Sequence, residues 1–409
     1  MSPSAPAKFR SDIPGRTLFA LSLLLLGAGC ARGNSGNAAG STPPGADPSM
    51  ESMEGSSDRS GQGVAASEAG EGVGVVVVEA EPQEAEAPSE PAAPVLLGSA
   101  AGHGPLPEHA RELFWGSVED DAPELLNATR PDLENRHYLT CDEVNLHTWY
   151  ERVRNLGGGY AGVGSDQAYT FIGWMRPELA WLSDYDPWIR ALHRSYHAFF
   201  QASEDIETFL SWWSDDTEDE AGAYLAEHYA EHPDLEMILL VYSEARYKIS
   251  RRLRRYGRTL DRAGVPSFIT DEETYQFVRS MVANGRVRPL ISNLLDDEAL
   301  RGIGEVGREL GVPLRVLYMS NAEDYWEYPD TFRENMRQLH FDEQSLILRS
   351  NATKSRNGDY RYNAQSSQNF VQWLNQPYVE DVEDIWVHES VRAEDHIPSS
   401  YINEAPEER

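Results

Sequence analysis

Apolar and polar residues follow two alternating patterns between residues 150 and 320, and the alternation predicts both the elements and their arrangement. Short apolar runs bounded by glycine or aspartate indicate buried strands, whereas apolar positions spaced three and four apart indicate helices. The predicted strands are 159–163, 179–183, 287–292 and 314–319. The predicted helices are 167–175, 188–200, 206–213 and 297–310. Strands that alternate with helices favour a mostly parallel sheet covered by helices on both faces, so we predict an α/β fold.

The first 30 residues have the features of a bacterial lipoprotein signal peptide. Basic residues precede a short apolar stretch, 18–26, and small residues lead from it to Cys30. We therefore predict that 1–29 is a signal peptide and that Cys30 carries lipid, which anchors the protein in the cell envelope. Ala31, where an aspartate would favour retention, points to the outer membrane. Gly27 stands where lipoproteins prefer leucine, so an ordinary cleaved signal or a misassigned start codon is the alternative.

A polar tract follows the cysteine and predicts a tether. Residues 31–100 are dominated by Gly, Ala, Ser, Pro and Glu. Such a composition buries too little apolar area to offset the entropy cost of ordering the chain. We assign 30–100 to a lipid-anchored, disordered tether, 101–390 to the folded domain and 391–409 to a polar C-terminal tail.

The composition and motifs of the chain argue against several classes of partner and of reaction. The net charge of −32 should repel nucleic-acid phosphates, so we expect no nucleic-acid partner. With Cys30 lipidated, Cys141 has no cysteine left for an intrachain disulfide. Asp142 and Glu143 beside it should raise the pKa of its thiol, which favours a buried structural cysteine over a nucleophile. The chain has no G-x-S-x-G, Walker A or zinc-ribbon motif, so neither a hydrolase nor a phosphotransferase is indicated.

The glycine-rich segment 157–166 is the most specific candidate site. Glycines at the end of a first strand let the backbone turn tightly and approach a nucleotide-like ligand. Asp184 follows about 20 residues later, at the end of the next predicted strand, where a carboxylate accepts hydrogen bonds from both ribose hydroxyls. The predicted ligand-binding residues are Gly162, Gly164, Gln167 and Asp184. The full G-x-G-x-x-G is absent, and close packing of helix on strand is the alternative explanation of the glycines.

Residues 139–350 resemble an uncharacterised bacterial family. Its members carry G-V-G-P-E-Q-N-F-T-Y-I, a strand that ends D-I-R-R, a helix H-L-M-Y-K-A-L-F-E and a later Y-L-S-N-V-E-Q-Y. This chain reads G-V-G-S-D-Q-A-Y-T-F-I from Gly162, has Asp184 in the D-I-R-R position and His193 in the helix, and reads Y-M-S-N-A-E-D-Y from Tyr318. The resemblance implies a Rossmann-like fold of the class I methyltransferase type. It implies no activity.

The chain departs from that family at charged positions. Asp186 and Pro187 replace its two arginines, Asn293 replaces an aspartate, and His197 replaces a lysine. The fold resemblance suggests S-adenosylmethionine, but that compound is kept in the cytoplasm, whereas this chain is expected outside it. The cofactor is therefore left unknown.

Two histidine pairs and one basic run complete the candidates. His193 and His197, like His228 and His232, are spaced for a shared metal ion, but no H-E-x-x-H or third ligand accompanies them, so we assign no metal site. Seven basic residues lie in the range 246–258. They could contact lipid phosphates or an anionic glycan, but the acidic segment just before them favours pairing within the chain.

The sequence leaves two functions open. The first is an exported, lipid-anchored domain that binds a small polar or nucleoside-like ligand. The alternative is a non-enzymatic envelope protein that uses the fold to bind a partner. Whether the protein is an enzyme is left open.

Overall fold

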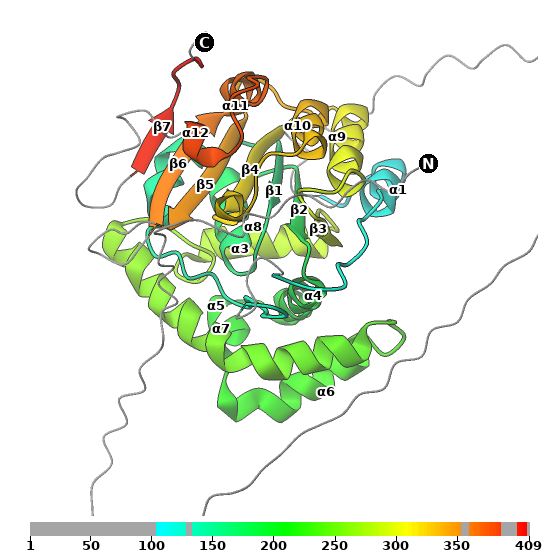
Figure 1. Cartoon of the computed structure of the whole chain (residues 1–409). Coiled ribbons are helices and arrows are strands. Elements are labelled where there is room, and N and C mark those ends of the chain that lie inside the picture. The colour runs from blue at the N-terminus through cyan, green and yellow to red at the C-terminus, as the bar shows by residue number, and fades with distance from the viewer. Residues whose placement is uncertain (1–103, 128–132, 353–359, 386–398, 407–409) are drawn as a thin grey trace, which may run out of the picture. The chain divides into compact units, whose positions relative to one another are not determined.

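A seven-stranded sheet forms the centre of the computed structural model (Figure 1). The structure describes residues 104–127, 133–352, 360–385 and 399–406, so the predicted signal peptide and tether lie outside the described residues. The strands are β1 (Gly159–Gly162), β2 (Leu179–Asp184), β3 (Val287–Ile291), β4 (Leu314–Ser320), β5 (Leu346–Ala352), β6 (Tyr360–Ser366) and β7 (Ser399–Ile402).

The strand order is β3-β2-β1-β4-β5-β6-β7, and the neighbours from β3 to β5 are all parallel. This is the order of a doubly wound Rossmann-like sheet, in which the chain reverses direction across the sheet between β1 and β4. The predicted mostly parallel α/β fold is therefore confirmed, with the four predicted strands as β1 to β4. The far edge differs, because β6 is antiparallel to β5 and β7 is parallel to β6.

Helices cover both faces of the sheet. On one side lie α3 (Gln167–Met175), α4 (Pro187–Ala202), α5 (Ile206–Ser211), α6 (Glu218–His228), α7 (Leu235–Ala263) and α8 (Glu272–Ala283). On the other lie α1 (Glu108–Gly116), α9 (Ala299–Leu310), α10 (Asp330–Gln338), α11 (Ser367–Leu374) and α12 (Val382–Ile385). A short helix, α2 (Tyr150–Val153), precedes β1.

Strand side chains alternate between the two cores. Tyr160 and Leu182 belong to the first core, whereas their neighbours Ala161 and Trp181 belong to the second. Both of these strands are thus apolar on both faces, which is why β1 and β2 read as continuous apolar runs rather than alternating ones.

Local sequence signals set the helix ends. Asp186 accepts a hydrogen bond from the Trp188 N–H at the start of α4, where Pro187 occupies the first turn. Gly264 ends α7 and Gly311 ends α9, both with a positive φ that residues with a Cβ rarely adopt. The predicted helices 167–175, 188–200, 206–213 and 297–310 correspond to α3, α4, α5 and α9.

The connection from β2 to β3 is unusually long and carries α4 to α8. Within it α7 has 29 residues and packs against α4 and α6. In Figure 1, α6 and α7 form the outer rim of the domain below the sheet. A crossover between neighbouring parallel strands needs only one helix, so these elements are additions to the basic fold.

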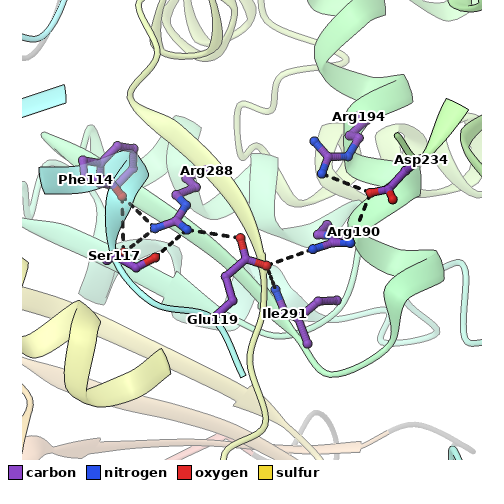
Figure 2. Close-up of polar contacts among 8 residues, drawn as sticks. All are labelled: Phe114, Ser117, Glu119, Arg190, Arg194, Asp234, Arg288 and Ile291. Carbon is purple, nitrogen blue, oxygen red and sulfur yellow. Dashed lines mark hydrogen bonds and ion pairs between the residues drawn. The ribbon is translucent and has the colours of Figure 1, made fainter. Parts of the chain in front are cut away.

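A chain of ion pairs ties this connection to the edge of the sheet (Figure 2). Glu119, which follows α1, accepts hydrogen bonds from Arg288 on β3 at 3.1 Å and from Arg190 on α4 at 2.9 Å. Asp234, before α7, pairs with Arg190 and with Arg194 one helical turn further along α4. Arg288 is only 5% exposed, so Glu119 supplies the countercharge for a buried guanidinium.

The end of the chain differs from the expected boundary. We expected the domain to stop at 390, before a polar tail, but β7 lies at Ser399–Ile402 and pairs with β6. The sheet therefore continues past that boundary. In the described part of the chain, no helix is long and apolar enough to cross a bilayer.

Candidate functional site

The site predicted from sequence lies at the reversal point of the sheet. β1 stands between β2 and β4, and the carboxyl ends of the three strands meet at Gly162, Asp184 and Ser320. In open α/β sheets, ligands bind in the crevice outside this edge. The four predicted ligand-binding residues are all found there, on β1, on β2 and in the turn and helix that follow β1.

Gln167 closes the turn after β1 from within. Its Nε2 donates to the Val163 carbonyl at 2.8 Å, and its Oε1 accepts from the Ser165 N–H at 3.1 Å. Gly164 has φ +86°, and a Cβ there would overlap the Gln167 amide nitrogen. The positive φ and the nearby Gln167 amide therefore explain why a glycine stands at position 164. The Gln167 side chain is almost fully buried, and its amide forms its hydrogen bonds inside the turn.

Asp184 joins the ends of β1 and β2. Its Oδ2 accepts from the Gly164 N–H at 2.8 Å, and its Oδ1 accepts from the Asp186 N–H at 3.0 Å. Burial raises the pKa of Asp184 to about 7, although hydrogen bonds from the backbone of Asp186, Gly164 and Tyr185 oppose that shift. A carboxylate offers about four acceptor positions. Three backbone donors leave about one acceptor position for a ligand, whereas the sequence predicted hydrogen bonds from two ligand hydroxyls.

Asp186 and Pro187 stand directly after β2, at the start of α4. Besides capping α4, Asp186 pairs with His137 at 2.8 Å, and the His137 ring stacks on Trp188 with centroids 3.9 Å apart. Burial raises the pKa of Asp186, and the hydrogen bond from His137 opposes that rise.

His193 supports the glycine turn. Its Nε2 lies 2.9 Å from the Gly164 carbonyl oxygen and its Nδ1 lies 3.0 Å from the Tyr169 hydroxyl. Burial lowers the pKa of His193 to about 4, and that of His197 to about 3. Among the described residues, no group of three or more His, Cys, Asp or Glu side chains is placed to hold a metal ion.

A buried ion pair beneath the turn was not predicted. Asp166 is fully buried, and its Oδ2 accepts from Arg252 Nε of α7 at 2.9 Å. The other oxygen accepts from the Cys141 N–H at 2.9 Å. Burial opposes the charge on Arg252, but Asp166, Cys141 and Tyr256 together outweigh burial and raise the pKa of the guanidinium. We expected Arg252 to pair with the preceding acidic segment, and its partner lies in the glycine turn instead.

A second buried carboxylate, Glu143, was also missed. It accepts hydrogen bonds from Tyr318 and Ser320 of β4 and from Ser350 of β5. Burial raises its pKa. The Cys141 Sγ donates to the same carboxylate at 3.4 Å, and burial, followed by Glu143, raises the pKa of this thiol well above its usual value. The thiol is a poor nucleophile, as the sequence predicted.

These contacts hold the segment 139–146 across the carboxyl end of the sheet. The Tyr362 hydroxyl of β6 accepts from the backbone N–H groups of Val144 and Asn145, at 3.1 and 2.9 Å. With Glu143 fixed to β4 and β5, the segment covers part of the edge at which Rossmann-like folds bind ligands.

Near β2, part of the carboxyl edge of the sheet is exposed to solvent. Val163 and Gly164 are half-buried, and Tyr138 is 48% exposed. Burial is the main cause of the raised pKa of Tyr185 and of Tyr325, and Tyr138 contributes to both, which places its ring near the two phenols. Tyr138 therefore lies near Tyr185, the residue that follows Asp184.

A separate pocket of about 260 Å³ lies at the opposite edge of the sheet. Its walls include Tyr150, Asn155, Trp174, Arg176 and Asp271, from the segment before β1, the end of α3 and the start of α8. No residue predicted from sequence to bind a ligand contributes to it.

The fold and this edge together define a Rossmann-like α/β domain whose reversal-point crevice is partly covered by its own chain. Residues 138–397 match the family model described as a domain of unknown function, DUF7790, and the chain belongs to that family. A comparison with curated proteins finds no match. Membership of an uncharacterised family, predicted from sequence for 139–350, is thus confirmed, and the matched range extends further toward the C-terminus.

Proposed function

We propose that this chain is an exported, lipid-anchored protein whose Rossmann-like domain binds a small polar, nucleoside-like ligand beside Asp184. The observation that carries the proposal is the hydrogen bond from the Gly164 N–H to Asp184 at the reversal point of the sheet. It joins the two features by which such folds recognise nucleosides, a glycine turn and an acidic residue at the end of the next strand.

The residual hydrogen-bonding capacity of Asp184 sets the ligand chemistry. About one acceptor position is left, so Asp184 would accept one ligand hydroxyl. A base or other flat group would pack against Tyr138, an exposed aromatic residue near Tyr185. Such a ligand is small, rich in hydroxyl groups and partly aromatic.

The residues present do not fit S-adenosylmethionine in the way the methyltransferase resemblance implies. At Gly164 the space that a ligand would approach is filled by Gln167, and at Gly162 it is filled by the Tyr160 hydroxyl. The segment 139–146, which covers part of this edge, also forms hydrogen bonds with Ser320 and with the Tyr362 hydroxyl. We therefore propose ligand binding and derive no methyl transfer.

The proposed location rests on the sequence before residue 31. A lipid on Cys30 would place the protein on the outer membrane, and the tether would let the domain sample a volume around its anchor. Cys30→Ser should release the protein into the soluble fraction, because one cysteine carries all the acyl chains. Unchanged membrane fractionation of that variant would refute the anchor.

A thermal-shift screen tests the ligand. Adenosine, other nucleosides and S-adenosylhomocysteine would be added to the full chain, and a compound at 100 times its Kd should stabilise the fold by about 2.7 kcal/mol. We expect a nucleoside to raise Tm in the wild type. No shift with any of these compounds would contradict the proposal.

One observation favours the alternative, a non-enzymatic protein that uses the fold to bind a partner. The turn needs no ligand for its own stability, because Gln167, His193 and Asp184 satisfy its polar groups. A negative screen would therefore make partner binding the leading function.

A further inference from the structure

The structure places a continuous basic face on the outer side of α7. Its exposed members are spaced three and four residues apart, so they project from one side of the helix. They are Lys248, Arg251, Arg254, Arg255, Arg258 and Arg262. The chain as a whole carries a net charge of −32, so this face stands out from the rest of the protein.

Pairing within the chain does not neutralise the basic face. Arg246, one turn before it, pairs with Asp215 and Glu218, as we expected of the whole basic run. Arg252 turns inward to Asp166. Among the described residues, none of the six cations of the basic face forms an ion pair, so the expected charge pairing holds only for Arg246.

The arrangement has a cost to the helix itself. Arg254 and Arg258 are four residues apart, as are Arg258 and Arg262, and like charges at this spacing destabilise a helix. The helix dipole favours cations only in the last turn, and the basic face begins three turns earlier. A bound polyanion would relieve this repulsion.

Two exposed apolar residues extend the same side of α7. Tyr247 is 54% exposed and Leu240 is 48% exposed, and they are seven residues apart, two turns of helix. The Arg251 guanidinium lies 5.6 Å from the centre of the Tyr247 ring. Tyrosine beside a row of cations suits the boundary between lipid headgroups and acyl chains.

We propose that the basic face of α7 binds an anionic lipid surface. A 29-residue helix on the outer rim of the domain presents these cations in a row, which a planar array of phosphates can match (Figure 1). The proposal extends the predicted membrane location, since it adds a contact that does not use the lipid on Cys30. Salt screens exposed charges beyond about 8 Å, so the acidic remainder of the surface opposes the contact only weakly.

Vesicle binding of the mature chain, residues 30–409, in its unlipidated Cys30→Ser form tests the proposal separately from the signal peptide, the anchor and the ligand crevice. Vesicles of phosphatidylglycerol and phosphatidylcholine would be compared with phosphatidylcholine alone by co-sedimentation. We expect binding to the anionic vesicles that weakens as salt rises. Failure to bind them at low salt would overturn the proposal.

A matched pair of double variants locates the contact. Arg254→Glu with Arg258→Glu should lower the vesicle partition coefficient by about 30-fold or more, since each cation near an anionic surface contributes about 1 kcal/mol. Arg111→Glu with Arg301→Glu changes the net charge equally at exposed sites outside α7 and should retain binding.

The α7 variant should fold, because both side chains are exposed and Arg258→Glu turns the repulsion with Arg262 into attraction, and circular dichroism checks this. An equal loss in both double variants would show a non-specific charge effect and refute the basic face as the binding site. Binding of duplex DNA with no binding of vesicles would also overturn the lipid proposal, in favour of a soluble polyanion.

Discussion

The raised pKa of Asp184 predicts that the stability of this domain falls as the pH rises from 5 to 8. Burial raises the pKa of this carboxyl from 3.8 to about 7 in the folded state. The folded state then binds more protons than the unfolded state between these two values, so the contribution of Asp184 to stability is full below pH 3.8 and is lost as the pH rises through 7. Each pH unit in that window costs about 1.4 kcal/mol, so the loss from pH 5 to pH 8 is about 2–3 kcal/mol.

Asp184→Asn isolates this effect. The amide does not titrate, so the stability difference between wild type and variant should shift by about 2–3 kcal/mol, in favour of the variant, from pH 5 to pH 8. Urea unfolding of both proteins at several pH values measures the difference, in which the raised pKa values of Glu143 and Asp186 largely cancel. Asp205→Asn is the control, because Asp205 also caps a backbone N–H but is exposed, with a pKa lowered from 3.8.

The stability difference between the wild type and Asp205→Asn should not change between pH 5 and pH 8. If the stability difference for Asp184→Asn is also independent of pH, Asp184 is ionised over the whole range, because its backbone hydrogen bonds outweigh the effect of burial on its pKa. Asp184 would then not be the weakly acidic, buried group proposed for this site.

Two further substitutions test the supports of the site, both by urea unfolding. Gly164→Ala should cost about 1–3 kcal/mol from its positive φ plus a steric term, since the new Cβ would overlap the Gln167 amide. Gly264→Ala, with a similar positive φ but open space around it, should cost less, and equal losses would contradict the role of Gln167. Glu119→Ala should cost about 2–4 kcal/mol because Arg288 stays buried without its carboxylate. Glu334→Ala, which breaks an exposed pair, should leave stability unchanged, and a similarly small effect of Glu119→Ala would refute the network in Figure 2.

The sequence predicts the β3-β2-β1-β4 half of the sheet because those strands are buried on both faces. β1 to β4 read as short apolar runs, and parallel neighbours end at the same edge, which is why Gly164 and Asp184 could be brought together from spacing alone. The strands β5 and β6 carry buried polar residues such as Arg349, Asn351 and Asn363. These residues break the apolar pattern, so the sequence did not predict either strand.

The unpredicted parts of the site depend on contacts distant in sequence. Glu143 meets Ser350 across more than 200 residues, and Arg252 meets Asp166 across 86. Local periodicity carries no information on such pairs. The inward rotamer of Gln167 is likewise set by packing, so sequence alone could place this residue at the turn but not show that its amide closes it.

Isothermal titration of adenosine into the wild-type chain and into Asp184→Ala measures ligand binding at Asp184. At about pH 8 Asp184, with its pKa of about 7, is mostly ionised, and a hydrogen bond to a charged group contributes about 1.5–3 kcal/mol. The variant should then bind about 10- to 150-fold more weakly, whereas Asp205→Ala should bind as the wild type does. An adenosine analogue that lacks both ribose hydroxyls should not distinguish Asp184→Ala from the wild type. Equal affinity of adenosine for wild type and Asp184→Ala, or no measurable binding to either, would contradict a ligand site at the carboxyl ends of β1 and β2.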